Sequence, residues 1–242
     1  MKIALVTGGS RGIGKAISLK LAQEGCYVLV NYRSNRVEAE DTLDRIRKTG
    51  GDGELMQFDV SDPDMVKQVL DGWHEANPGK TIEVLVNNAG LNRDNLMVFM
   101  SDKEWQEVIA TNQHGFFYVT RHLLQNMLVH KKGQIVNIVS LSGQKGLAGQ
   151  VNYAASKGAV IAATKSLAME VGKKKVRVNA VAPGFISTEM TAGLDEKQLS
   201  MMVPLRRFGT PEEVAEVVSF LVSDKASYIT GEIICVNGGM HS

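Results

Sequence analysis

The stretch IALVTGGSRGIG, residues 3–14, joins a short apolar run to a glycine-rich turn. The run is typical of a buried β-strand, and the residues that follow have the spacing of a helix over 11–24. Between the two, Gly8 allows a tight turn, Gly12 lets the backbone approach a ligand, and Gly14 lets helix and strand pack closely. Because a helix N-terminus offers free N–H groups and a partial positive charge, the stretch predicts a βα unit that binds an anion.

The same alternation of strand and helix continues along the chain. Further β-branched runs are CYVLVNY, GELMQFDV, IEVLVNNAG, GQIVNIVS, VRVNAVAPG and EIICVNGG. Helical patterns lie at 35–48, 62–76, 102–130, 150–172 and 211–222. Strands that are apolar on both faces and separated by helices predict a parallel sheet covered on both sides. We therefore expect one α/β domain over residues 1–242, a Rossmann-type doubly wound sheet of about seven strands with helices on both faces.

Composition excludes several classes of function. The 27 basic and 26 acidic residues leave a formal charge of +1, which gives no general attraction to nucleic acid or anionic lipid. No stretch approaches the length of a membrane span, and the first apolar run is too short for a signal peptide, so we expect a soluble, cytoplasmic protein.

Cys26 and Cys235 lie in strand-like runs and are expected to be buried thiols. The histidines form no i, i+4 pair, and we expect no metal site.

Polar and glycine clusters follow the predicted strands, at the edge where doubly wound sheets bind ligands. These clusters are TGGSRGIG, NYRSN, DV, NNAG, SLSG and PGFIST. The segment 184–209 is the longest stretch expected to be irregular, and we expect it to cap the site. The sequence thus predicts one ligand site at the carboxyl edge of the sheet.

The glycine turn and the second strand together indicate which ligand binds. The glycine spacing of the turn differs from the dinucleotide-binding pattern G-x-G-x-x-G. The position of the turn between a strand and a helix, and not the spacing, therefore indicates a dinucleotide. A carboxylate at the end of the second strand would bind the ribose of NAD, whereas a 2′-phosphate needs arginine. This chain has Arg33 there and no acid before Glu38, and Arg11 can reach the same phosphate. We expect NADP(H); the alternative is that both arginines are merely solvated.

The stretch VNYAASKGAV, residues 151–160, places Tyr153 and Lys157 four positions apart among small residues. In a helix, side chains at this spacing lie on one face, with Cβ atoms roughly 5–6 Å apart. Taken alone, the pair is more typical of an ordinary surface helix than of a functional site. The small neighbours Ala154, Ala155 and Gly158 would let a ligand come close to it.

Several motifs together carry a family resemblance. TGGSRGIG, NNAG, NYAASK and PG followed by IST, in this order, resemble the short-chain dehydrogenase/reductase family across the whole chain. NRDNLM, GQKGLAGQVNYAASKG, VRVNAVAPGFISTEMT and PLRRFGTPEEVA are most similar to bacterial 3-oxoacyl-acyl carrier protein reductases, and then to acetoacetyl-coenzyme A reductases. The resemblance implies NADPH-dependent reduction of a 3-oxoacyl thioester in fatty acid or related synthesis. Alternatives are a coenzyme A or polyketide-type ketoreductase, and a dinucleotide-sensing protein without catalysis.

The resemblance also implies catalytic residues. Tyr153 is expected to be the general acid and Lys157 its partner. An ammonium at roughly 4 Å, at an effective dielectric constant near 20, stabilises a phenolate by about 4 kcal/mol, so we expect a pKa of Tyr153 about 3 units below 10. Ser140 is expected to hold the substrate carbonyl, with Ser142 as the alternative, and Asn112 to help hold a proton-relay water.

By the same resemblance, the cofactor site is expected to include residues from the ends of several strands. They are Gly8, Gly9, Ser10, Arg11, Gly12, Ile13, Gly14, Arg33, Asp59, Val60, Asn88, Ala89, Gly90, Tyr153, Lys157, Pro183, Gly184, Ile186 and Thr188.

Two basic clusters, HKKG and GKKKVR, end the helical patterns 102–130 and 150–172. By resemblance, Lys131 and Lys174 in these clusters are expected to dock an acidic acyl carrier protein. Cations at helix C-termini also complement the helix dipole, which is the alternative reading. The resemblance further implies a homotetramer in which these helices pair between subunits, although a core-facing helix would have a similar pattern.

Overall fold

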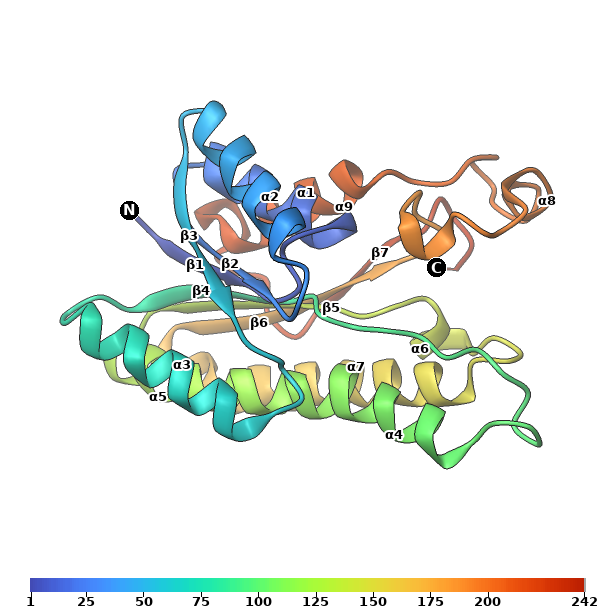
Figure 1. Ribbon diagram of the computed structural model, residues 1–242, viewed down its shortest axis with the longest axis horizontal. Coiled ribbons are helices and arrows are strands. Elements are labelled where there is room, and N and C mark those ends of the chain that lie inside the picture. The colour runs from blue at the N-terminus through green and yellow to red at the C-terminus, as the bar shows by residue number, and fades with distance from the viewer. Residues whose placement is uncertain (242) are drawn as a thin grey trace.

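The computed structural model describes residues 1–241 and contains a seven-stranded sheet in which all neighbouring strands are parallel. Ser242, the last residue of the predicted domain, lies outside the described residues. The strand order is β3-β2-β1-β4-β5-β6-β7 (Figure 1), which confirms the predicted doubly wound fold. The strands are β1 (Ile3–Val6), β2 (Tyr27–Tyr32), β3 (Asp52–Gln57), β4 (Ile82–Asn87), β5 (Gly133–Ile138), β6 (Val176–Pro183) and β7 (Ile233–Val236).

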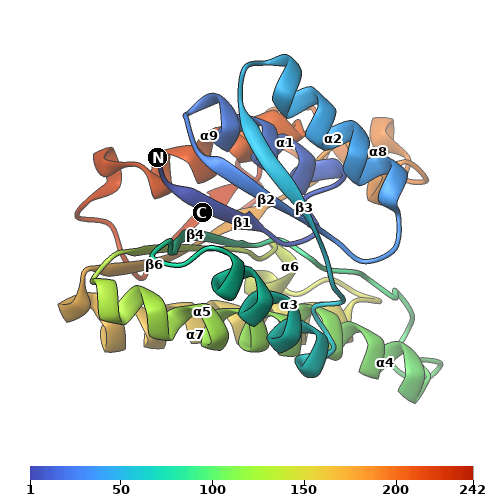
Figure 2. The same cartoon turned by 60° about the vertical axis from the view of Figure 1, so that its left-hand side comes forward.

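Helices cover both faces of the sheet. In Figures 1 and 2 one face carries α1 (Gly12–Gln23), α2 (Arg36–Lys48) and α9 (Pro211–Val222). The other carries α3 (Pro63–Ala76), α4 (Asp102–Ile109), α5 (Gly115–His130) and α7 (Val151–Val171). Short turns are η1 (Ala110–His114), α6 (Ser142–Lys145), η2 (Gly172–Lys174), η3 (Glu189–Thr191), α8 (Glu196–Ser200) and η4 (Asp224–Ala226).

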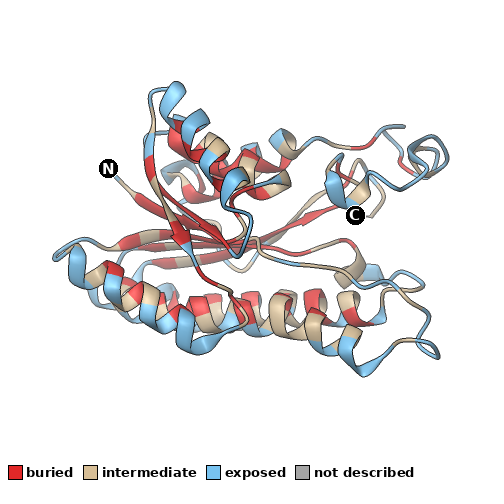
Figure 3. Ribbon diagram, in the orientation of Figure 1, coloured by how far each residue is buried: buried red, intermediate tan, exposed pale blue. Residues whose placement is uncertain are grey.

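Apolar residues on both faces of the strands produce two main hydrophobic cores. One core packs α1, α2 and α9 against the sheet, and the other packs α3, α5 and α7. Figure 3 shows the buried residues concentrated on the strands and on the helix sides that face them. Within residues 1–241, no helix combines the length and apolarity needed to cross a membrane. Cys26 is buried as expected, but Cys235 is only partly buried, and its Sγ donates to Gln144 Oε1 at 3.3 Å.

Two segments differ from the sequence prediction. The helix expected over 102–130 is interrupted by a π-helical turn, η1, which contains Asn112. The Asn112 side chain bonds the backbone of Leu91 on a neighbouring loop, and such turns are frequent where function needs a locally widened helix. The segment 184–209, expected to be irregular, contains η3 and α8, because Thr188 and Asp195 cap these short turns.

A chain of buried amides and hydroxyls ties the sheet to two helices. Asn87 on β4 and Asn137 on β5 stand opposite each other in the parallel register. Asn87 Nδ2 donates to Asn137 Oδ1 and to Thr120 Oγ1 on α5, each at 2.9 Å. Asn137 Nδ2 in turn donates to Thr164 Oγ1 on α7 at 2.9 Å. All four side chains are buried, so their hydrogen bonds have no competition from water.

We expect Asn137→Ala to lower the free energy of unfolding by about 2–3 kcal/mol, because it removes one hydrogen-bond partner each from the buried side chains of Asn87 and Thr164. Urea unfolding followed by circular dichroism would measure the change. Gln23→Ala, at an exposed position of α1, is the control and should change stability by less than about 0.5 kcal/mol. Equal stability of the Asn137 variant and the control would contradict this account of the network.

Candidate active site

The glycine turn is held by asparagine side chains from neighbouring strands. Gly8 N–H donates to Asn31 Oδ1 at 3.0 Å, and the Asn31 amide donates to the carbonyls of Met56 and Phe58. From the other side, Asn88 Nδ2 donates to the carbonyl oxygens of Thr7 and Gly8 at 2.9 and 3.1 Å. The turn therefore has a fixed shape although it contains no regular secondary structure.

The turn has the form of a cradle that only glycines permit. Gly8 and Gly12 adopt left-handed backbone conformations, with φ of 60° and 52°. A Cβ on Gly14 would lie 2.1 Å from the carbonyl oxygen of Gly8, so α1 can approach the turn this closely only with glycine at that position. Arg11, at the N-cap of α1, provides no side-chain cap, which leaves the first N–H groups of the helix for a ligand. The residues present thus fit the pyrophosphate of a dinucleotide.

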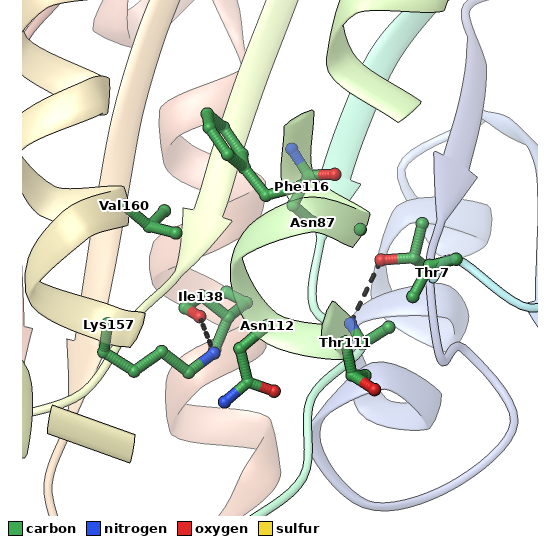
Figure 4. A pocket seen from close by; sticks show the side chains of 11 residues that line it. Thr7, Asn87, Thr111, Asn112, Phe116, Ile138, Lys157 and Val160 are labelled. Atoms are coloured by element: carbon green, nitrogen blue, oxygen red, sulfur yellow. Dashed lines mark hydrogen bonds between the residues drawn. The ribbon is translucent and has the colours of Figure 1, made fainter. Parts of the chain in front are cut away.

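Ser140, Tyr153 and Lys157 come together at the carboxyl end of β5. Lys157 is 5% exposed, and its Nζ donates to the carbonyl oxygen of Ile138 at 2.8 Å (Figure 4). Nζ lies 5.7 Å from the centroid of the Tyr153 ring, so the two side chains share one face of α7 as expected. The Ser140 hydroxyl is near enough to the Tyr153 phenol to lower its pKa, and it accepts a hydrogen bond from the N–H of Ser142 at 3.1 Å.

Asn112 lies beside Lys157. A Cβ on Gly90 would stand 3.2 Å from Asn112 Oδ1 and 3.3 Å from Lys157 Nζ, so both polar atoms flank this glycine. Asn112 Nδ2 donates to Ser156 Oγ at 3.0 Å, which links the π-helical turn to α7. Asn112, Lys157 and Thr7 line a cavity of about 10 Å³ (Figure 4), which is at the lower limit for a single water molecule.

The pKa values of the pair differ from the sequence prediction. Tyr153 is partly exposed as a residue, but burial of its phenol raises its pKa to about 12. Two smaller effects oppose each other: the nearby Ser140 hydroxyl lowers the pKa and the charge of Asp94 raises it. Burial lowers the pKa of Lys157 to about 8. The expected lowering of the Tyr153 pKa is therefore wrong for this structure. Removal of the ammonium and the phenol from water disfavours both charged forms, and Lys157 Nζ is bonded to Ile138 instead.

Three residues support the site without having been predicted to do so. Gln150 Nε2 donates to Asp94 Oδ2 at 2.8 Å, and Ser142 Oγ donates to Gln150 Oε1 at 2.7 Å. Ser142, expected only as a substitute for Ser140, thus positions Ser140 through its own N–H. Asp94 and Gln150 occur in stretches that carried the family resemblance, but no local pattern in the sequence points to their contact.

The remaining predicted cofactor residues also lie at the carboxyl edge. Arg33 follows β2 and lies near Asp59, with 3.7 Å between Nη1 and Oδ2. Val60 is buried against Gly115, and Asn88, Ala89 and Gly90 follow β4. Pro183 ends β6, Gly184 and Ile186 follow it, and Thr188 reaches the glycine turn, 3.7 Å from where a Cβ of Gly12 would stand. Gly9, Ser10 and Ile13 belong to the turn and the start of α1.

Lys131 and Lys174 lie elsewhere. They follow α5 and α7 and precede β5 and β6, which places them at the amino edge of the sheet. Along α7 and the short turn η2, the interval of 21 positions from Tyr153 to Lys174 corresponds to about 30 Å. On one chain, the basic clusters and the predicted catalytic residues are therefore at opposite edges of the sheet.

Comparison with known proteins places this geometry in a family. Residues 8–241 match a family model described as enoyl-(acyl carrier protein) reductase. The chain belongs to the short-chain dehydrogenase/reductase family. It is 45% identical over 243 residues to a 3-oxoacyl-acyl-carrier-protein reductase of Staphylococcus aureus strain Mu50, covering 99% of this chain and 98% of the relative. Reductases with the same name from Synechocystis and Vibrio cholerae are 44% and 43% identical over 240 and 243 residues, covering 99% of this chain and 96% and 97% of theirs.

Family membership confirms the predicted reaction class. Members are oxidoreductases that use a nicotinamide dinucleotide, and the glycine cradle of this chain fits such a cofactor. When bound, the cofactor supplies or accepts a hydride at its nicotinamide ring. In this chain, Ser140, Tyr153 and Lys157 provide the polar groups at the same edge of the sheet.

The lowered pKa of Lys157 predicts a pH effect on stability. At neutral pH the Lys157 ammonium is mostly charged in both the folded and the unfolded chain. Between a pH of about 8, the pKa in the folded state, and pH 10.5, the ordinary pKa, the folded state binds fewer protons than the unfolded state. The free energy of unfolding should therefore rise with pH in this window. Relative to Lys157→Met, the free energy of unfolding of the native protein should increase by roughly 1–3 kcal/mol across that window. Denaturant unfolding of both proteins at several pH values measures it, and a difference that stays constant with pH would contradict the burial of the ammonium.

Proposed function

We propose that this protein reduces a 3-oxoacyl thioester, carried on acyl carrier protein, to the 3-hydroxyacyl thioester with NADPH. The observation that carries this proposal is the pair of neighbouring hydroxyls, Ser140 and Tyr153, at the edge of the sheet that holds the glycine cradle. Two neighbouring hydroxyls can both bind a single carbonyl oxygen. The relatives named as 3-oxoacyl-acyl-carrier-protein reductases support the thioester substrate.

In this reaction the protein's residues move a proton to the carbonyl oxygen. With its pKa raised to about 12, Tyr153 keeps its proton at neutral pH and can donate it as negative charge develops on the oxygen. Ser140 donates a hydrogen bond to the same oxygen. Lys157, whose pKa is lowered to about 8, can exchange protons near neutral pH and faces the cavity beside Asn112, which offers a route to return a proton to Tyr153.

The description of the family model names an enoyl reduction, in which a carbon–carbon double bond accepts the hydride. The Ser140–Tyr153 pair favours a ketone instead, because proton delivery to an oxygen uses both hydroxyls directly. A coenzyme A thioester can carry the same 3-oxo group and is the alternative substrate. The comparison of a carrier-bound substrate with a short thioester, described below, distinguishes the two.

The choice of NADPH over NADH rests on Arg33 and Arg11. Arg33 follows β2, where a carboxylate would favour NAD, and Arg11 lies in the glycine turn. The assignment of residues 1–242 to one NADP(H)-binding domain, with 184–209 as the substrate cap, is part of the same proposal. So is the cytoplasmic location expected from the sequence.

Carrier docking near Lys131 and Lys174 has a geometric consequence. These lysines lie at the edge opposite to Tyr153, so a carrier bound there would serve the site of another subunit more readily than that of its own. The homotetramer expected from the resemblance would provide such a neighbour. Docking and assembly are thus proposed together.

Tyr153→Phe should remove most turnover with NADPH and a 3-oxoacyl thioester, by about 10²- to 10⁴-fold, because it deletes the proton donor alone. NADPH binding should remain nearly intact. NADPH absorbance gives the rate and fluorescence titration gives the affinity. Tyr228→Phe, at a fully exposed position, is the control and should retain full activity. A Tyr153 variant that keeps more than about a tenth of the native rate would exclude this role.

Lys131→Glu together with Lys174→Glu should reduce kcat/KM for a carrier-bound substrate, more at low salt than at high salt, because rim charges act on association. A short coenzyme A or cysteamine thioester should be almost unaffected. Lys48→Glu with Lys225→Glu makes the same change in charge at other exposed positions and should affect neither substrate. Equal losses on both substrates would indicate damage to the fold, and no loss on either would favour the coenzyme A thioester.

A further inference from the structure

Both arginines proposed to bind the 2′-phosphate have carboxylate partners in this structure. Arg11 Nη1 lies 3.2 Å from Glu189 Oε2, and Arg33 Nη1 lies 3.7 Å from Asp59 Oδ2. A phosphate that binds these guanidinium groups has to replace those carboxylates or bind beside them. The carboxylates are therefore part of the selectivity for the cofactor, and their effect has the opposite sign to that of the arginines.

The two carboxylates are held differently. Asp59 Oδ1 also accepts hydrogen bonds from the N–H of Ser61 at 2.9 Å and from its hydroxyl at 2.7 Å, so this side chain shapes the turn before α3. Glu189 has Arg11 as its ion-pair partner within residues 1–241, at the shorter of the two distances. Glu189 is thus the carboxylate whose removal would change the arginine's surroundings without disturbing a turn.

The Arg11–Glu189 pair joins segments that are 178 positions apart in the sequence. Arg11 precedes α1 in the glycine turn, and Glu189 begins η3 in the segment 184–209. The backbone of η3 is fixed by Thr191, whose hydroxyl accepts from Thr188 N–H at 3.0 Å and donates to the carbonyl of Ile186 at 2.7 Å. The carboxylate of Glu189 is therefore presented to the glycine turn from a well-ordered base.

We propose that Glu189 is a specificity-determining residue that competes with the 2′-phosphate of the cofactor for Arg11. Binding of a 2′-phosphorylated nucleotide exchanges the Arg11–Glu189 pair for an Arg11–phosphate pair. This inference rests on the proposed use of NADP(H). It assigns to Glu189 a reduced preference for the phosphorylated cofactor.

The balance of charges supports the exchange. Both side chains are about two-thirds exposed, at 65% for Arg11 and 68% for Glu189, and ion pairs so exposed to solvent are weak. A phosphate carries more charge than a carboxylate and offers more oxygens to the planar guanidinium, so it can displace Glu189. Loss of the carboxylate should strengthen binding of the 2′-phosphate by about two- to five-fold, the size expected of one exposed ion pair.

Adenosine 2′,5′-bisphosphate and adenosine 5′-monophosphate test the exchange without the nicotinamide, because they differ only in the 2′-phosphate. Isothermal titration of the full chain at low salt should show that Glu189→Gln binds the bisphosphate about two- to five-fold more tightly than the native protein does. Its affinity for the monophosphate should be unchanged. The gain should shrink at high salt, since screening weakens exposed pairs. Glu196→Gln, in α8 of the same segment and also exposed, is the matched control and should change neither affinity.

The outcomes separate this inference from the cofactor assignment. If the native protein prefers the bisphosphate and Glu189→Gln binds it no better, the competition is wrong and the use of NADP(H) stands. If the native protein shows no preference but Glu189→Gln does, the competition is supported and the preference for NADP(H) is wrong. If neither protein distinguishes the two nucleotides, Arg11 does not bind a 2′-phosphate and both are overturned.

Discussion

The position of α7 on the sheet depends on a row of buried hydrogen bonds made by side chains of the strands and of the helix. Asn137 joins β5 to Asn87 on β4 and to Thr164 on α7, and about two turns earlier on the helix Lys157 donates to the last carbonyl of β5. A shift of α7 by one residue would leave several buried polar groups unpaired, each at a cost of about 1–3 kcal/mol. These hydrogen bonds therefore fix the position of Tyr153 relative to the sheet.

The same burial sets the chemistry of the site. Tyr153 and Lys157 are close enough to attract each other, yet each shifts toward its neutral form, with pKa values of about 12 and about 8. Desolvation acts on both groups at once, whereas the attraction requires both to be charged. The result is a phenol that retains its proton and an amine that can exchange one near neutral pH, which suits delivery of a proton followed by its replacement.

Side-chain amides give the loops around the site their shape. The side chains of Asn31 and Asn88 hydrogen-bond the backbone of Gly8, beyond the end of β1. In the π-helical turn, the Asn112 side chain accepts a hydrogen bond from the backbone N–H of Leu91 in the same way. Gln150, between Asp94 and Ser142, does the same for the loops that carry Ser140. Each amide supplies donors and an acceptor in one rigid plane, so segments without regular structure still have a fixed shape. The site consequently combines loop residues such as Ser140 with Tyr153 and Lys157 on α7.

The sequence alone determined what is local or repeated. Alternating strand and helix patterns predicted the parallel sheet, the glycine spacing predicted the cradle, and a four-residue interval placed Tyr153 and Lys157 on one helix face. Since parallel strands end at one edge, the residues after each strand could also be expected to meet. Only the tertiary structure decided the π-helical turn at Asn112, the contact of Asp94 with Gln150 and the direction of the Tyr153 pKa. These depend on contacts between distant residues and on the exclusion of water, which neither spacing nor composition encodes.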